Sequence, residues 1–175
     1  QAIVNGDGVG KPLGILQSGA LVSQGRTTAS LVADEDISRM WSRRYLGAND
    51  YIWLVNASVM PQLYAMTVGD MPVYMPPGGM SGAQYGSIFG RPVIETEYNP
   101  YLGTAGDVML ISPSNYAMIT KGGVEAASSI HIKFDYDETA FRFVYRVDGE
   151  PLNASPITAY DGTATVSPFV ALAAT

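Results

Sequence analysis

Apolar residues recur at every third or fourth position between residues 35 and 46, so they share one face of a helix. This spacing predicts an amphipathic helix that Asp34 caps at its start and that Gly47 terminates. Residues 50–55, DYIWLV, form a continuous apolar run rich in β-favouring side chains. Such a short run predicts a buried strand soon after the helix.

Capping residues and a long loop shape the next part of the chain. Asn56 or Ser58 is expected to cap a second helix that continues through Met66. Residues 69–87 are rich in glycine, proline and methionine, which predicts a long loop. A loop of this length is generally functional or disordered. Its methionine and tyrosine side chains are favoured at contacts between proteins, and the alternative is a flexible surface insertion.

The second half of the chain is rich in strand patterns. Strands are predicted over 88–97, with an entry kink at Gly90, over 107–111 and over 116–121. One turn of helix is expected to begin at Ser112. Helical spacing early in the chain and alternating spacing later predict a mixed α+β fold.

An alternation of apolar and polar residues predicts a long β-ribbon near the end of the chain. The even positions from 130 to 134 share one face of a first strand, and the odd positions from 141 to 147 share one face of a second. The acidic turn 135–138 is expected to join them. Residues 152–160 and 166–172 are predicted to supply a final strand and a loosely held tail.

Composition and charge narrow the function classes. The chain has 175 residues, of which 47% are hydrophobic, enough for one well-buried domain or two connected lobes. Its net charge of -6 predicts no broad attraction to nucleic acid, and we expect no sequence-specific binding to it. It has no cysteine, which excludes disulfides, thiolate zinc sites and a cysteine nucleophile. No apolar run reaches the roughly 18 residues of a membrane span, so we expect a soluble protein without a membrane partner.

The first sixteen residues, QAIVNGDGVGKPLGIL, contain a glycine-rich turn. Glycines supply positive φ angles, Asp7 can accept a bond from its own backbone, and Pro12 fixes an extended exit. The residues expected to build this rigid corner are Asn5, Gly6, Asp7, Gly8, Pro12 and Gly14. The spacing fits neither a P-loop nor a dinucleotide fingerprint, and a calcium loop would place Val9 and Leu16 at ligand positions. We therefore expect no cofactor and no metal.

The string NGDG-x-G-x-PLGIL in these residues resembles the turn that follows the spine helix in major capsid proteins of tailed bacteriophages of the Hong Kong 97 type. Weaker matches to that family follow in the same order at Trp53–Leu63, Phe89–Val93, Val108–Ile111, Tyr116–Thr120 and Arg146–Gly149. The resemblance implies the Hong Kong 97-type capsid fold. The family's N-terminal arm, hairpin loop and spine helix precede this turn. With the lack of an initial methionine, this suggests a proteolytic or engineered C-terminal fragment.

The same resemblance implies a division of the chain. Residues 1–14 would form a junction, residues 15–121 and 151–175 an axial-domain-like lobe, and residues 122–150 a peripheral-domain-like ribbon. It places the loop 69–87 at the axis where five or six copies converge. The residues implied in contacts between subunits there are Met71, Val73, Tyr74 and Met75.

The function implied by the resemblance is that of a structural subunit of an icosahedral phage or prophage capsid, which forms pentamers and hexamers around the viral genome. Its partners would be copies of itself, with scaffolding, portal and decoration proteins as further candidates. It would lie in the virion capsid and, during assembly, in the host bacterial cytoplasm. An encapsulin-type nanocompartment shell protein is an alternative with the same fold. A β-rich carbohydrate-binding module is another, although Trp41 and Trp53 lie in apolar patterns that predict burial.

An enzyme is not expected. His131 is the single histidine, and its alternating position places it away from Ile130 and Ile132, with no nucleophile to act on. Ser81 lacks the second glycine of a nucleophile elbow. The acids of 135–138 are interpreted as a solvated hairpin tip rather than a catalytic pair.

Overall fold

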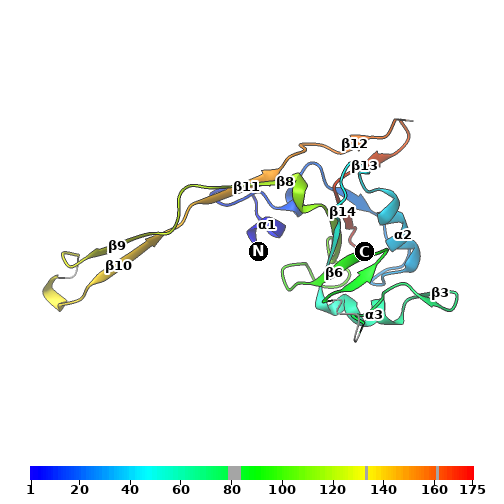
Figure 1. The fold of residues 1–175 in the computed structure, drawn as a ribbon, viewed down its shortest axis with the longest axis horizontal. Coiled ribbons are helices and arrows are strands. Elements are labelled where there is room, and N and C mark those ends of the chain that lie inside the picture. The colour runs from blue at the N-terminus through cyan, green and yellow to red at the C-terminus, as the bar shows by residue number, and fades with distance from the viewer. Residues whose placement is uncertain (79–83, 133, 161) are drawn as a thin grey trace.

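The computed structural model describes residues 1–78, 84–132, 134–160 and 162–175. A lobe of strands and short helices carries a long two-stranded ribbon that projects from one side (Figure 1). The lobe is built on a mixed sheet with the strand order β1-β14-β7-β2-β6-β5. These strands are β1 (Val22–Gln24), β14 (Phe169–Leu172), β7 (Val108–Ile111), β2 (Ile52–Val55), β6 (Arg91–Glu95) and β5 (Gly86–Ile88). The pairs β1–β14 and β2–β6 are parallel, and the other neighbours in this sheet are antiparallel.

The central strands are covered on both faces. Every residue of β7 and β14 is buried, which explains why both read as continuous apolar runs. On one face Trp53, Leu110 and Val170 belong to a cluster with residues of α2 (Asp34–Ser42) and α3 (Met60–Ala65). The buried residues of the second cluster are Val4, Ile15, Ala20, Met109, Ile111, Phe169 and Ala171. The N-terminal segment therefore closes the other face of the sheet.

The first predicted helix exists, but its ends differ from the prediction. Asp34 is the first helical residue and not the cap. The carboxylate of Asp36 supplies the cap instead, because it accepts hydrogen bonds from Ala33 N–H at 3.1 Å and from Thr27 N–H at 2.9 Å. The helix ends at Ser42, earlier than predicted, because the backbone that follows pairs with the segment leading into β14.

The second predicted helix is confirmed. The Asn56 side chain accepts a hydrogen bond from Ser58 N–H at 2.9 Å and caps η2 (Ala57–Val59), which continues into α3. Leu63 and Met66 are buried, as their spacing predicts. The position of α3 directly after β2 brings the helix against the sheet.

The single strand predicted over residues 88–97 is a hairpin of two strands. β5 and β6 are antiparallel neighbours, and the chain reverses between them at Phe89 and Gly90. Both residues have positive φ, 51° and 70°, which is the backbone conformation that a tight hairpin turn requires. Gly90 is therefore the turn itself and not an entry kink.

The ribbon consists of two antiparallel segments in series. Its strands are β8 (Tyr116–Thr120), β9 (Glu125–Ser129), β10 (Ala140–Val144) and β11 (Val147–Pro151). β8 pairs with β11 beside the lobe, and β9 pairs with β10 farther out (Figure 1). The prediction of a first outer strand at 130–134 is wrong, because the strand ends at Ser129, which pairs with Ala140, and residues 130–132 and 134–139 lie outside any strand. Pairing also begins at Tyr116, whereas the implied division started the ribbon at residue 122.

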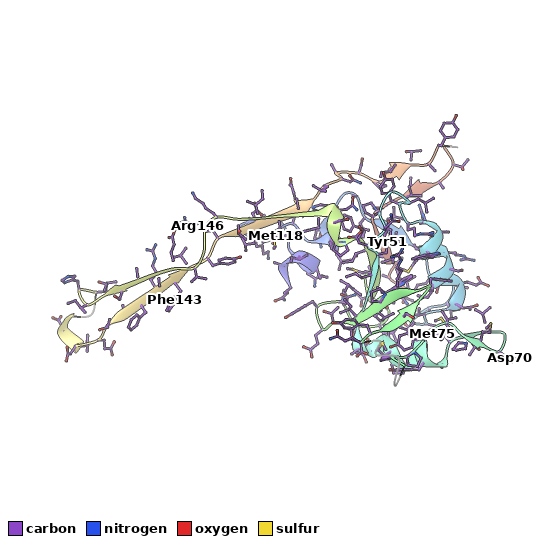
Figure 2. All side chains as sticks on the ribbon, viewed as in Figure 1. Tyr51, Asp70, Met75, Met118, Phe143 and Arg146 are labelled. Atoms are coloured by element: carbon purple, nitrogen blue, oxygen red, sulfur yellow. The ribbon has the colours of Figure 1, made fainter. Side chains whose placement is uncertain are left out.

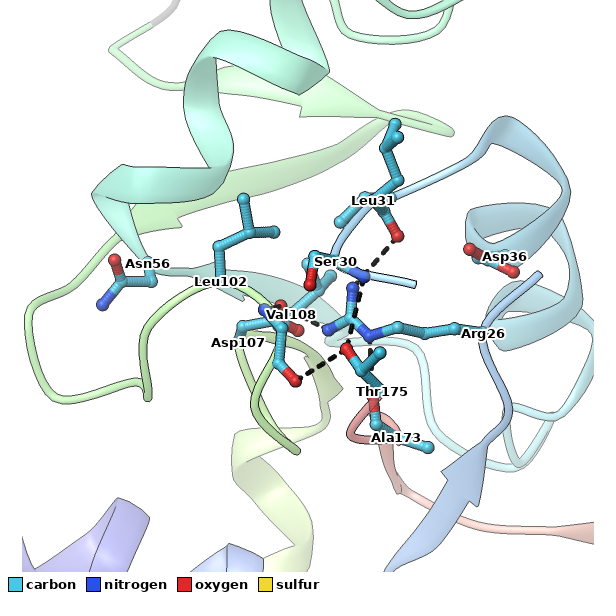
Figure 3. A network of polar contacts seen from close by, with 12 residues as sticks. Arg26, Ser30, Leu31, Asp36, Asn56, Leu102, Asp107, Val108, Ala173 and Thr175 are labelled. Carbon is cyan, nitrogen blue, oxygen red and sulfur yellow. Dashed lines mark hydrogen bonds and ion pairs between the residues drawn. The ribbon is translucent and has the colours of Figure 1, made fainter. Parts of the chain in front are cut away.

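The segment predicted as a loose tail contains β14, a strand whose four residues are all buried. β14 lies between β1 and β7, and the residues after it are held by the side chain of Arg26 (Figure 3). The guanidinium of Arg26 donates to Ala173 O at 2.8 Å and forms a buried ion pair with Asp107. The Thr175 hydroxyl donates to Gly103 O at 3.1 Å. These bonds tie the end of the described chain to the loop before β7.

Short elements complete the structure. They are α1 (Ala2–Asn5), η1 (Ile15–Gln17), β3 (Thr67–Val68), β4 (Met71–Pro72), η4 (Pro113–Asn115), η5 (Phe134–Tyr136), β12 (Ile157–Thr158) and β13 (Thr165–Val166). The helical turn η4 matches the prediction at Ser112. Within the described ranges, no helix is both long and apolar enough to cross a bilayer.

Candidate functional site

The glycine-rich corner near the N-terminus folds the backbone back on itself. The N–H of Gly14 donates to Gly6 O at 2.8 Å. The Asp7 carboxylate accepts a hydrogen bond from Val9 N–H at 3.0 Å, as predicted. This bond, followed by the contact with the Lys11 ammonium at 3.2 Å, lowers the pKa of Asp7 below its ordinary value. The corner is therefore ordered by its own side chains.

The glycines of the corner serve two different purposes. Gly8 has a φ of 76°, as predicted for a turn glycine. Gly6 and Gly14 have negative φ, -65° and -72°, so the prediction of positive φ does not apply to them. A Cβ on Gly14 would lie 2.7 Å from Val4 O, and Gly6 is similarly close to the carbonyl of the buried Pro12. Close backbone approach is what requires glycine at these two positions.

The corner joins the lobe to the base of the ribbon. The side-chain amide of Asn5 donates to Tyr98 O at 2.5 Å on the lobe side. On the ribbon side, Leu13 N–H donates to Gly149 O at 2.8 Å, and the Tyr116 hydroxyl donates to Leu13 O at 2.9 Å. An open pocket of about 470 Å³ beside this joint is lined in part by Asp7, Leu13, Ile119, Asp148 and Glu150. The corner thus holds the base of the ribbon against the lobe.

An apolar groove of about 500 Å³ lies between the start of α2 and the β3–β4 hairpin. Asp34 and Glu35 stand on one side of it, and its apolar lining consists of Val68, Met71, Pro72, Val73 and Phe89. Met71 is 75% exposed and Met75, beyond the groove, is 57% exposed. Val73 is half-buried. Three of the four predicted contact residues therefore reach the surface, and two of these line one groove.

Tyr74 differs from the other predicted contact residues because its ring is buried in the core. The ring meets Tyr64 edge to face, with 5.2 Å between ring centroids, and lies against Gly86. Burial raises the pKa of Tyr74. Only 4% of Tyr74 is exposed, which leaves little of the ring for a second copy to contact, so the prediction for Tyr74 is corrected: the side chain supports the loop from inside. The loop has no periodic pattern that distinguishes inward from outward positions, which is why the sequence did not reveal this.

The ribbon presents an aromatic stripe to solvent. Phe141, Phe143 and Tyr145 alternate along β10 and its extension, so their side chains share one face. Phe141 and Phe143 are each 70% exposed and stand opposite Ser128 and Ala126, which are too small to cover them. Figure 2 shows Phe143 on the part of the ribbon that is clear of the lobe. Such a contiguous apolar patch is typical of an interaction surface.

The residues considered for catalysis, metal binding and glycan binding do not come together in one site within the described part of the chain. His131 is exposed in the tip of the ribbon, outside any strand, and Ser81 lies outside the described residues. In the part of the chain that the structure describes, no three potential metal-ligating side chains gather into a site. Trp53 is buried and Trp41 stacks on it at 6.4 Å between centroids, so this pair does not form a flat face for a glycan.

The apolar groove was not predicted, because three separate segments build it. The start of α2, the β3–β4 hairpin and Phe89 come together only in the folded lobe. The available signal was the bulky Phe89 directly before Gly90, since a bulky residue with positive φ is uncommon. Phe89 stacks on Trp41 at 5.4 Å between centroids, which connects the groove to the core.

Comparisons with known proteins identify a family and a fold. A family model described as "Phage capsid family" matches residues 1–162. No curated protein matches the chain. Two solved structures, "Capsid of empty GTA particle computed with C5 symmetry" and "Capsid of native GTA particle computed with C5 symmetry", are 15% and 16% identical with TM-scores of 0.69 and 0.66. Each comparison covers 99% of this chain and 60% of the other, so the chain spans less than two thirds of those capsid chains and shares their fold.

Proposed function

Because the chain belongs to the phage capsid family, we propose that it forms part of the structural subunit of an icosahedral phage or prophage capsid. The shell encloses the viral genome and is built from pentamers and hexamers of the subunit. The subunit resides in the virion and, during assembly, in the cytoplasm of the host bacterium. Its role is mechanical, and we assign it no catalytic activity.

The aromatic stripe is the observation that carries this proposal at the level of residues. A two-stranded ribbon is marginally stable in water by itself, yet Phe141, Phe143 and Tyr145 face solvent. At about 200 Å² for each aromatic side chain, the three rings expose on the order of 400 Å², the size of the largest apolar patch on a typical monomer, which is often functional. Copies of the subunit that pack on the stripe remove this surface from water.

The apolar groove supplies a second contact between copies. Met71 and Val73 line it, and we assign them, with Met75, to the contacts inside a ring of five or six subunits. Rings of two sizes require one sequence to accept two contact geometries. Unbranched methionine side chains adapt to both, and Gly69, with a φ of 61° at the tip of the hairpin, faces open space. Tyr74 holds the loop in place from the core.

Assembly of the complete subunit tests the proposal. The whole reading frame that contains residues 1–175 is expressed, and the product is examined by sedimentation velocity and electron microscopy. We expect closed shells of uniform size. Phe141→Ser with Phe143→Ser should abolish the shells while the monomer keeps its circular dichroism spectrum, and Tyr160→Ser, which alters a fully exposed ring away from the stripe, should not. A wild-type product that remains monomeric would contradict the proposal.

A further inference from the structure

Charge is separated along the length of the ribbon. The tip sequence, residues 130–139, contains three carboxylates and one lysine, Lys133, so its net charge is negative, and Asp135 and Asp137 are exposed there. The middle of the ribbon carries exposed cations, which we call the cationic elbow: Lys121, Arg142 and Arg146. Glu125 lies on the same face as Arg142, so three cations and one carboxylate leave the elbow with a net positive charge.

Two residues of the elbow are bonded to each other across the ribbon through their backbones. The N–H of Lys121 donates to Arg146 O at 3.1 Å, at the point where the inner and outer segments of the ribbon meet. Like charges directly opposite on two strands destabilise the pairing. Among the residues that the structure describes, neither side chain forms an ion pair with a carboxylate. An anionic partner at the elbow would relieve this repulsion.

The elbow and the aromatic stripe occupy different faces. Arg142 alternates with Phe141 and Phe143 in β10, so its side chain points away from the stripe. Figure 2 shows Arg146 on the ribbon, well separated from the lobe. In the outer segment of the ribbon, one face therefore offers apolar packing, while the other carries the positive charge of Arg142. The two faces can engage different neighbours at the same time.

We infer that the acidic tip of one ribbon docks on the cationic elbow of a second copy of the chain. This inference rests on the proposed function, because it assigns a partner to a ribbon that copies of the subunit share. At about 3.3 Å per residue, Asp137 lies up to about 30 Å along the strand from Arg146 and up to about 16 Å from Arg142, both beyond the reach of an ion pair. A tip cannot reach the elbow of its own ribbon over these distances, so the complementary charge comes from another copy.

Nucleic acid is the other anion that the elbow could hold, but the surrounding charges oppose it. Asp148 and Glu150 lie at the base of the ribbon, and Asp135 and Asp137 lie at its tip. These carboxylates would repel a duplex that runs along the ribbon, and three cations can neutralise few of its phosphates. The net charge of -6 for the whole chain adds to this repulsion. A compact carboxylate tip fits the short elbow better.

The test reverses the charge of the tip in one variant of the complete subunit and the charge of the elbow in another. The tip variant carries Asp135→Lys with Asp137→Asn, because asparagine tolerates the positive φ of 53° at position 137. The elbow variant carries Lys121→Gln with Arg146→Glu. All four side chains are exposed, so each variant should keep the melting temperature of the wild-type monomer.

Each variant alone should lower the yield of shells about tenfold or more in sedimentation, because like charges then meet at the contact. A mixture of the two variants should raise the yield above that of either variant alone, since an altered tip can then meet an altered elbow of opposite charge. The matched control is Glu95→Lys with Glu97→Gln, which makes the same charge change as the tip variant at exposed positions of the lobe. This control should assemble like the wild type.

Normal assembly of either variant would overturn the inference, and so would a mixture that fails to assemble. A wild-type subunit that forms no shells would instead contradict the proposed function, so the two failures are distinct. Fluorescence anisotropy with a labelled DNA duplex covers the alternative. Binding by the wild type that the elbow variant loses, without a defect in assembly, would assign the elbow to nucleic acid.

Discussion

The ring of Tyr74 lies directly against Gly86: a Cβ added to Gly86 would overlap the hydroxyl oxygen and lie 2.5 Å from the Cε2 atom of the ring. This contact joins β5 to the loop that carries Met71 and Met75. Gly86 is not among the positive-φ glycines, so the reason for glycine here is space. The exposed contact residues thus depend on a buried neighbour.

Gly86→Ala should destabilise the lobe by about 1 to 3 kcal/mol, because the ring of Tyr74 must move out of a packed site. Urea unfolding followed by circular dichroism measures the change. Gly123→Ala is the control, since a Cβ at Gly123 meets no atom within 4 Å and should change stability by less than about 0.5 kcal/mol. Equal effects at the two positions would show that Tyr74 does not restrict Gly86.

Arg26→Met should cost about 3 to 5 kcal/mol of unfolding free energy, because it leaves the buried carboxylate of Asp107 without its cation. Lys11→Met removes one partner of the exposed pair with Asp7 and should cost less than about 1 kcal/mol. Thermal melting of both variants gives the comparison. A small loss for Arg26→Met would mean that the bonds from Gly103 and Val108 N–H groups alone stabilise Asp107.

Stability should fall as the pH rises from about 10 to about 12, in part through Tyr51. Burial raises the pKa of Tyr51 from 10.0 to about 12. The unfolded chain therefore loses this proton first and binds fewer protons than the folded chain, so its free energy falls relative to that of the folded chain as the pH increases. The contribution of up to about 2 to 3 kcal/mol is complete below pH 10 and is lost as the pH passes through the folded pKa.

Urea unfolding of the wild type and of Tyr51→Phe between about pH 10 and about pH 12 isolates the effect of Tyr51 ionisation on stability. At lower pH the variant should lose about 1 kcal/mol, because the Tyr51 hydroxyl no longer donates to Tyr45 O, a bond of 2.8 Å in the wild type. Its stability should then depend less on pH than that of the wild type. Parallel pH profiles would contradict the assignment.

Met71→Ser with Met75→Ser should reduce shell yield from the complete subunit while changing monomer stability by less than about 0.5 kcal/mol, since both side chains are exposed. Tyr74→Ser should instead destabilise the monomer by about 3 kcal/mol or more, as expected for a buried aromatic ring. Sedimentation and chemical unfolding separate the two effects. Normal shells from the double methionine variant would remove the groove from the proposed contacts.

Much of the lobe could be predicted from the sequence, because its signals are local. The helical spacing before residue 46 and the apolar runs of β2 and β7 each indicate an element without reference to the rest of the chain. The position of β14 could not be predicted in this way. Its run of apolar residues fits a buried strand, but only the folded sheet places it between β1 and β7.

The register of the ribbon was missed for a different reason. The apolar alternation at Ile130 and Ile132 continues into the tip, whereas the true strand β9 has the sequence EAASS and no apolar stripe of its own. Its position is set by cross-strand pairing with β10. The stripe itself was visible at Phe141 and Phe143. The hydrogen bonds from the glycine-rich corner to the base of the ribbon connect segments that are far apart in the sequence, so no local pattern of residues predicts them.

The place of β14 in the sheet sets an order of events during synthesis. β1 and β7 leave the ribosome before β14, so each keeps an unpaired edge until the late strand inserts between them. The ribbon depends on pairings over much shorter sequence separations and can form earlier. In a nascent subunit, the ribbon and its exposed aromatic stripe can therefore form before the sheet of the lobe is complete. If the ribbons of neighbouring nascent chains associated at that stage, the unpaired edges of β1 and β7 would be held close together. Late insertion of β14 therefore makes the nascent chains prone to aggregate when several ribosomes translate the same message.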